Sequence, residues 1–278
     1  MNRLEDIFGY ENLNQHDLDT AKRYLEVLNQ AADSKSELYV NAEFTSHGIA
    51  MCCNPENTIG GILISGLNPG YNEDFPNGLF YSFDNTMRDR NLYNPSEVWR
   101  NKQKQFFNGD YTLLPKTAYI DLFPYTQSIQ NQFMSDISKN IKFQVRTLEI
   151  TLDEIEFLHP KLIVESNTAT SYYWGTSDYT WMGYNLKKLE KEEMPQCVRN
   201  TKLRLYKIVG ETGFKTANDR IGQNKYSRSN LLGSYFIDYA QYIEKHEERC
   251  KEYMLTPELL KSLYNEILNE TSDDTVKV

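Results

Sequence analysis

Residues 61–70 read Gly61-Ile62-Leu63-Ile64-Ser65-Gly66-Leu67-Asn68-Pro69-Gly70, an apolar run of strand length that stops in a glycine–proline turn. The side chains at 62–64 are typical of a strand buried on both faces, as in a parallel sheet. Gly66, Pro69 and Gly70 favour a turn, and Gly70 can adopt a backbone conformation that a side chain would forbid. Open α/β sheets bind ligands at loops that leave the carboxyl ends of such strands. Asn68 is therefore a candidate site residue, with support of the turn as the alternative role.

The composition predicts a folded chain that is long enough to bury a sizeable core. Of its 278 residues, 40% are hydrophobic and 13% aromatic, whereas disordered chains are poor in aromatic residues. The net charge of −9 does not favour a nucleic-acid binder, whose footprint is normally basic. It does not exclude one, because binding depends on the local patch.

The motifs of several common cofactor sites are missing. The four cysteines are too few and too scattered for a disulfide scaffold, and no cysteine cluster suggests zinc or an iron–sulfur centre. The chain contains no G-x-G-x-x-G and no G-K-[ST] phosphate cradle. It begins without an apolar signal segment, and no run approaches transmembrane length. We expect a reduced, cytoplasmic protein with no cofactor, no bound metal and no membrane partner.

Changes of pattern divide the chain into three predicted segments. They are an N-terminal helical and strand addition, 1–58; a main α/β domain, 59–250; and a C-terminal helix with a polar tail, 251–278. In the addition, apolar spacing predicts a helix over 18–32 and short strands at 38–40 and 49–53, on either side of a turn around His47.

The main domain alternates strands and helices. Strands are predicted at 61–65, 117–121, 161–165 and 203–209, and helices at 96–107, 135–158, 168–174 and 230–247. Such alternation implies a parallel sheet with helices on both faces, a three-layer α/β/α sandwich. A last amphipathic helix is expected at 257–268, followed by a disordered tail over 271–278.

Three motifs resemble the uracil-DNA glycosylase superfamily when they are taken in order. Gly66-Leu67-Asn68-Pro69-Gly70, followed by Gly78-Leu79-Phe80-Tyr81-Ser82, is similar to its first motif, in the form of the mismatch-specific, thymine-DNA-glycosylase-like branch. Ile120-Asp121-Leu122-Phe123-Pro124-Tyr125 is similar to the N-L-x-P-Y segment, and Pro160-Lys161-Leu162-Ile163-Val164 to the third strand. The resemblance covers roughly residues 61–246 and implies a divergent member with the fold predicted above.

The resemblance implies roles for three residues of the first motif. Asn68 matches the position that orients the attacking water, and Tyr81 matches the aromatic residue on which a flipped base stacks. Core packing is the alternative role of Tyr81. Gly70 matches the position where the uracil-specific branch carries a tyrosine that excludes the thymine methyl group, so the base pocket would be roomy.

Two positions depart from the family pattern. Asp121 replaces the asparagine that reads the base, and an ionised carboxylate only accepts hydrogen bonds, which would suit the two adjacent donors of guanine. Its alternative role is to cap the turn 122–125. No histidine lies near the later H-P-S-P-L-S motif; Asn224 in Asn224–Ser229 is the nearest match to the asparagine form and could donate to the leaving base. A polar surface loop is the alternative for this segment.

Basic residues crowd the same loop region and predict a DNA-binding surface. The resemblance implies phosphate contact for Ser227, and the cluster itself suggests it for Lys215, Arg220, Lys225 and Arg228. Basic residues between Arg88 and Lys104 would extend this patch. A solvated surface is the alternative for each of them singly.

These observations support a DNA glycosylase that hydrolyses the N-glycosidic bond of a deaminated or mismatched base. Asn68, Gly70 and Tyr81 favour this hypothesis. The alternative is a catalytically weak or inactive member of the fold that binds nucleic acid or a nucleotide, which Asp121 and the missing histidine favour.

Overall fold

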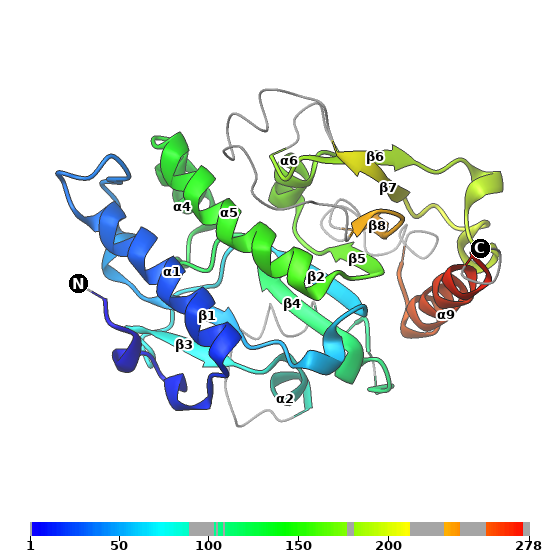
Figure 1. The fold of residues 1–278 in the computed structure, drawn as a ribbon, viewed down its shortest axis with the longest axis horizontal. Coiled ribbons are helices and arrows are strands. Elements are labelled where there is room, and N and C mark those ends of the chain that lie inside the picture. The colour runs from blue at the N-terminus through cyan, green and yellow to red at the C-terminus, as the bar shows by residue number, and fades with distance from the viewer. Residues whose placement is uncertain are drawn as a thin grey trace.

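A computed structural model describes residues 2–88, 103, 105–107, 109–176, 181–211, 231–239 and 254–274. The fold is mixed α/β and is built on a mostly parallel six-stranded sheet (Figure 1). A second, two-stranded sheet lies in the N-terminal half. Within the described residues, no helix is long and apolar enough to cross a membrane.

The large sheet has the strand order β4-β2-β5-β8-β7-β6. The four parallel strands are β4 (Thr117–Asp121), β2 (Ile62–Gly66), β5 (Leu162–Glu165) and β8 (Tyr235–Asp238). The other two, β7 (Leu205–Glu211) and β6 (Tyr184–Lys188), are antiparallel and extend one side. Every residue of β2 is buried, as expected for a strand covered on both faces. β2 is the first strand of this sheet in the chain, and it lies between β4 and β5, which both pair with it in parallel.

The order in which parallel strands join the sheet changes direction at β2. The chain passes from β2 to β4 on one side, and then returns to β5 on the other side. Open α/β sheets bind ligands at such a switch point, outside the carboxyl ends of the two strands that flank it. The loops that follow β2 and β5 are therefore the part of the fold best placed for a site.

Alternate side chains of the parallel strands enter two separate cores. Leu63 and Ile163 pack with α1 (Gln15–Ala32), α4 (Gln130–Ile137) and α5 (Ile141–Leu158). Ile62 and Ile64 pack with α2 (Phe83–Arg88) and α9 (Pro257–Asp274) on the other face. Figure 1 shows α1 lying beside α5, and α9 lying apart from both. Helices thus contribute to both faces of the sheet.

The N-terminal residues pack into the same core as the main sheet. β1 (Ile49–Cys52) pairs in parallel with β3 (Gly78–Tyr81), and the amide of Ala50 donates to the Pro124 carbonyl just beyond β4. The Asn54 side chain donates to the Tyr119 carbonyl and accepts from its amide, so it occupies the outer edge of β4. The small sheet is thereby attached beside the carboxyl end of β4.

Most predicted elements are present within a few residues, but several expectations are wrong. The strand expected at 203–209 in the parallel sheet is antiparallel, since β7 pairs antiparallel with both β6 and β8. Residues 38–40 form no strand, because the Val40 amide bonds back to the Ala31 carbonyl at the end of α1. The helix expected over 135–158 is two helices, since Asn140 accepts from the Phe143 amide and starts a new one. Helix α5 ends as predicted before Pro160, at His159 with φ of 30°.

A further correction adds a strand to the sheet. The segment expected to open a helix at 230–247 contains strand β8, whose residues are buried on both faces and pair with both β5 and β7. An apolar run placed between two strands gains more from pairing than from a helix that would leave their edges open. The rest of that segment, like most of the helix expected at 96–107, lies outside the described residues.

At the C-terminus, α9 continues to Asp274, so the start of the tail that was expected to be disordered is helical. The short helix expected at 168–174 is present as a 3-10 turn, Thr168–Thr170, followed by α6 (Ser171–Trp174).

Candidate functional site at the carboxyl edge of the sheet

The four parallel strands end side by side in polar residues. Gly66 pairs with Asp121, Ser65 with Glu165, and Glu165 with Asp238. Three carboxyl groups therefore occupy one edge of the sheet, where the switch point also lies. Because side chains alternate along a strand, Ser65, Glu165 and Asp238 share one face of the sheet, and Asp121 lies on the other.

Asp121 is held by its own strand and fits only because its neighbour is glycine. The Tyr119 hydroxyl donates to Oδ1 of Asp121 at 2.9 Å. A Cβ on Gly66 would stand 2.1 Å from that oxygen and 2.2 Å from the Tyr119 hydroxyl. Burial raises the pKa of Asp121 from 3.8 to about 7, against the opposing effect of the Tyr119 hydrogen bond. A substantial part of Asp121 is therefore neutral near pH 7 and can donate a hydrogen bond as well as accept one.

The turn-capping alternative for Asp121 is not what the structure shows. The amides of Leu122 and Phe123, at the start of that turn, donate to the carbonyls of Gly66 and Leu67. The turn is therefore stabilised by the loop that follows β2. The Asp121 carboxyl group takes its hydrogen bond from Tyr119 instead.

Asn68 is anchored through its amide nitrogen. Its Nδ2 donates to the carbonyls of Pro69 and Gln127, each at 3.1 Å. Both amide hydrogens are thus engaged, and the ambiguity between the nitrogen and oxygen ends of the side chain is resolved by these two acceptors. Oδ1 is left as the group that a ligand or water can use. Asn68 is half-buried, in the loop at the switch point.

Gly70 is exposed and open. Its φ is not positive, and a Cβ there would meet nothing within 4 Å. The backbone freedom that glycine offers at this turn is therefore not used at Gly70. A side chain at this position would extend into open space. Position 66, by contrast, requires glycine, because a Cβ there would overlap the Asp121 carboxyl group and the Tyr119 hydroxyl.

Tyr81 lies at the end of β3, on the two-stranded sheet. Its carbonyl accepts from the Cys53 amide at 2.8 Å, and its side chain is half-buried against the core that contains α2 and α9. It therefore comes from a different sheet than Asn68 and Asp121. The side chain packs partly into the core and keeps partial exposure, so both roles considered for it stay open.

Glu165 and Asp238 form a buried carboxyl pair that sequence patterns alone did not reveal. Each is 0% exposed, on neighbouring parallel strands. Oε1 of Glu165 accepts from Thr170 at 2.8 Å and from Ser171 at 2.6 Å, whereas its Oε2 and the Asp238 Oδ1 have no hydrogen-bond partner. Burial raises the pKa of Glu165 to about 8.

The charge on this pair belongs to Asp238. Arg204 lies 3.5 Å from the Asp238 Oδ2 and opposes the effect of burial, which raises the pKa of Asp238. Because two adjacent buried carboxylates do not both ionise easily, Glu165 is the neutral member near pH 7. A signal was available in the sequence: three apolar runs, AYID, LIVE and YFID, each end in an acid.

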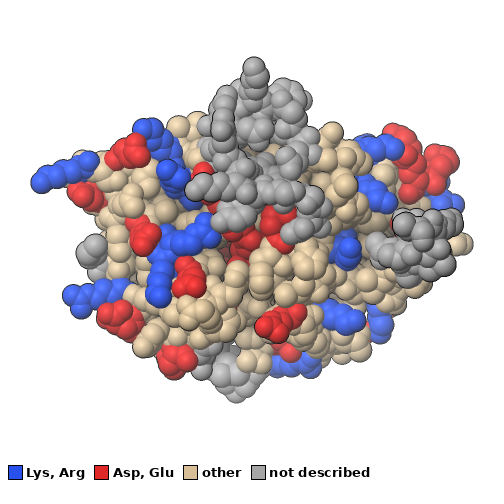
Figure 2. Space-filling view, viewed as in Figure 1, with Lys and Arg blue, Asp and Glu red and all other residues tan. Residues whose placement is uncertain are grey.

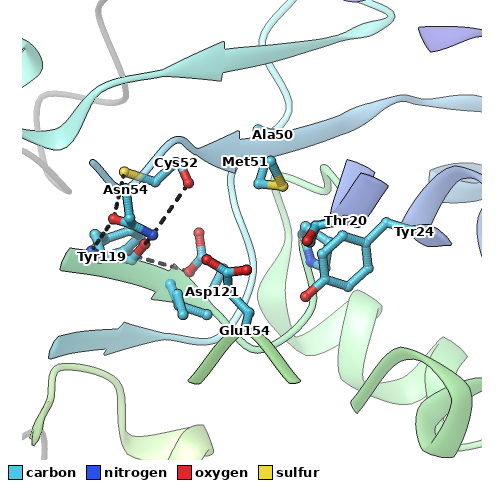
Figure 3. Close-up of a pocket in the computed structure, with 11 residues that line it drawn as sticks. Thr20, Tyr24, Ala50, Met51, Cys52, Asn54, Tyr119, Asp121 and Glu154 are labelled. Atoms are coloured by element: carbon cyan, nitrogen blue, oxygen red, sulfur yellow. Dashed lines mark hydrogen bonds between the residues drawn. The ribbon is translucent and has the colours of Figure 1, made fainter. Parts of the chain in front are cut away.

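A small, partly open cavity lies between α1, β1, β4 and α5. It measures about 20 Å³, and Asp121, Glu154 and Asn54 line it together with Tyr24 (Figure 3). This volume holds about one water molecule and excludes a nucleobase. Glu154 also contacts Nε2 of His16 at 2.6 Å. The cavity is therefore a small pocket in the core and not a base-binding pocket, so a base could reach Asp121 only from outside this cavity.

Several predicted site residues lie outside the described residues: Asn224, Lys215, Arg220, Lys225, Ser227 and Arg228. In the chain they fall between β7 and β8, and the end of β7 and the start of β8 lie at the amino edge of the parallel strands, opposite the carboxyl edge. Arg88, the first basic residue of the 88–104 region, pairs with Asp84 and lies over the Tyr111 ring. On the face in Figure 2, basic and acidic side chains of the described residues are interspersed.

Among the described residues, no three histidine, cysteine or acidic side chains are grouped as a metal site. Cys52, Cys53 and Cys197 are free thiols. Comparisons with protein-family models, with curated proteins and with solved structures find no match to this chain.

Proposed function

We propose that this protein is a uracil-DNA glycosylase-like enzyme, with the three-layer α/β/α sandwich of that superfamily. It would hydrolyse the N-glycosidic bond of a deaminated or mismatched base in DNA. The observation that carries the proposal is the anchored Asn68 side chain. Its amide hydrogens are used by two backbone carbonyls, and its oxygen is left for a ligand at the switch point.

The chemistry needs a group of this kind. Cleavage of an N-glycosidic bond passes through a state with oxocarbenium character at C1′ of the sugar, while the electron pair of the bond leaves with the base. A water molecule then adds its oxygen to C1′ and loses a proton. Oδ1 of Asn68 accepts a hydrogen bond from that water and orients its lone pair, although an amide is too weak a base to remove the proton early. This arrangement suits a slow enzyme and a good leaving group.

Asp121 gives the proposal a means of reading the base. With a pKa of about 7, its carboxyl group exists in both forms near neutral pH. The ionised form accepts from the two adjacent donors of guanine-like edges, whereas the neutral form can also donate to a carbonyl such as O4 of uracil. Asp121, which replaces the family's base-reading asparagine, therefore offers a hydrogen-bond donor over the part of the pH range in which it is neutral.

The second candidate is a protein of the same fold that binds a nucleotide or nucleic acid without cleaving it. The weak basicity of Asn68 and the carboxyl group that replaces the base-reading amide at position 121 favour it. The two candidates share a ligand site and differ in turnover.

A single-turnover cleavage panel separates them. The substrates are duplex and single-stranded oligonucleotides that carry uracil, hypoxanthine, xanthine or a thymine mismatch. Release of a free base by the wild type, and its loss in Asn68→Ala, supports the glycosylase. Binding of these oligonucleotides without release of any base supports the second candidate, and the absence of both excludes the two proposals together.

A further inference from the structure

The turn at His47 reaches the loop that carries Asn68. His47 follows a 3-10 turn, Glu43–Ser46, in the N-terminal part of the chain and is 9% exposed. Its Nδ1 lies 3.0 Å from the Thr126 carbonyl, so this nitrogen carries the hydrogen and donates. Its ring stacks on Tyr71 with the centroids 4.0 Å apart.

Two backbone segments meet at this histidine. The Thr126 amide donates to the Gly48 carbonyl at 3.3 Å, and the next amide, of Gln127, donates to the Pro69 carbonyl at 3.0 Å. The Gln127 carbonyl then accepts from Nδ2 of Asn68. A continuous chain of hydrogen bonds thus runs from His47 through residues 126–127 to the Asn68 carboxamide.

The ring contact acts on the same loop from its other end. Tyr71 lies three residues beyond Asn68, and its carbonyl accepts from the Ser128 hydroxyl at 3.3 Å. His47 therefore contacts both segments that set the position of Asn68. The turn itself is constrained, because a Cβ on Gly48 would stand 1.6 Å from the Asn77 carbonyl oxygen. Little freedom remains for the turn to shift without disturbing this packing.

We propose that His47 is a positioning residue: its Nδ1–H bond to Thr126 holds the Gln127 carbonyl where it orients the Asn68 carboxamide. The N-terminal segment thereby completes a site built mainly by the sheet, and it is more than a covering of the core. The catalytic meaning of this role rests on the function proposed above. The structural link from His47 through residues 126–127 to Asn68, called the relay below, does not depend on that function, and it is tested separately.

The relay is read from the side-chain amide of Asn68 by NMR, with Asn68→Asp used to assign the signal. His47→Asn can still donate to the Thr126 carbonyl, whereas His47→Phe keeps a ring against Tyr71 and cannot donate. We expect exchange of the Asn68 amide hydrogens to be unchanged in His47→Asn and about tenfold faster in His47→Phe. Glu43→Gln, which alters the exposed carboxylate 3.9 Å from His47 Nε2, is the matched control and leaves exchange unchanged.

Cleavage gives the second measurement. With an active wild type, His47→Phe lowers the single-turnover rate about 10- to 100-fold with little change in DNA affinity, and His47→Asn restores it. Unchanged amide exchange in His47→Phe would overturn the relay whether or not the protein is an enzyme. Altered exchange in a protein that releases no base would uphold the relay and remove only the proposed function.

Discussion

The hydroxyl of Tyr119 donates a 2.9 Å hydrogen bond to Oδ1 of Asp121, and both groups lie over Gly66 of the neighbouring strand. This arrangement depends on strand geometry and on the glycine at position 66, and it affects the pKa of Asp121. Side chains two apart on a strand point to the same face, so Tyr119 and Asp121 can meet. They meet over β2 only because position 66 has no Cβ. The result is a half-buried aspartate whose pKa lies near 7, at the end of β4.

The first prediction contrasts the two glycines of the central turn. Gly66→Ala forces a methyl group to within 2.1 Å of Asp121 and is expected to lower the free energy of unfolding by about 1–3 kcal/mol. Gly70→Ala places its methyl group in open space and should change stability by less than about 0.5 kcal/mol. Urea denaturation of both variants measures the difference. Equal losses would show that Gly66 is not the closely packed position.

The second prediction concerns base preference and pH. If the neutral form of Asp121 donates to O4 of uracil, uracil release by the wild type decreases as pH rises through about 7. Asp121→Asn keeps a donor at every pH, so it should flatten this dependence and favour uracil over other substrates by about tenfold. The measurement is the single-turnover rate between pH 5.5 and 8.5, with the protein held in excess over duplex DNA. An unchanged profile in the variant would assign the titration to another group.

The third prediction concerns Asn68. Asn68→Ala should reduce turnover by about 10²- to 10³-fold and leave DNA affinity nearly intact, because the side chain acts mainly on the transition state. Asn68→Asp should retain or raise activity, since a carboxylate polarises water and stabilises a developing cation. Single-turnover rates and binding isotherms on the same oligonucleotides separate the two effects. A fully active Asn68→Ala variant would transfer the water-orienting role to a different residue.

The fourth prediction is thermodynamic and does not depend on function. The pKa of Glu165 is raised from 4.5 to about 8, so the folded state keeps a proton that the unfolded chain has lost between these values. Its contribution to stability is therefore complete below about pH 4.5 and is lost as pH rises to about 8. The slope for one proton is about 1.4 kcal/mol per pH unit.

Glu165→Gln removes this titration while retaining a neutral side chain of similar shape. The difference in unfolding free energy between wild type and variant should therefore change with pH by up to that slope between pH 5.5 and 7.5. Glu192→Gln, at an exposed position, is the matched control and should show no such trend. Parallel stability curves for wild type and Glu165→Gln would mean that Glu165 is ionised throughout.

The fifth prediction addresses the basic segment whose structure is not described. If Lys225 and Arg228 contact phosphates, neutralising both should weaken DNA binding and lower the slope of log K against log salt by about two. Fluorescence anisotropy from 50 to 200 mM salt provides the measurement. A wild type that binds no DNA at low salt would exclude a nucleic-acid ligand and point to a small molecule.

The sequence was sufficient for the elements whose residues carry their own pattern. The apolar run at 62–64 with its turn, the alternation that predicts parallel strands, and the spacing of α1 and α9 are local signals. They are decided by burial and by backbone preferences over a few residues. Asn68 could also be predicted as a site residue from the sequence, because a polar residue just after a buried strand is expected at the ligand edge of the sheet.

Only the tertiary structure decided which distant groups meet. An apolar segment such as 235–238 is compatible with a helix or a strand, and the open edges of β5 and β7 selected the strand. The pairing of Glu165 with Asp238 depends on strand register, and the orientation of Asn68 depends on a carbonyl 59 residues away. Such contacts follow from the summed packing of the whole chain, and no local pattern encodes them. The sequence thus specified strands such as β2 together with the turns that follow them, and the fold determined which groups meet at their ends.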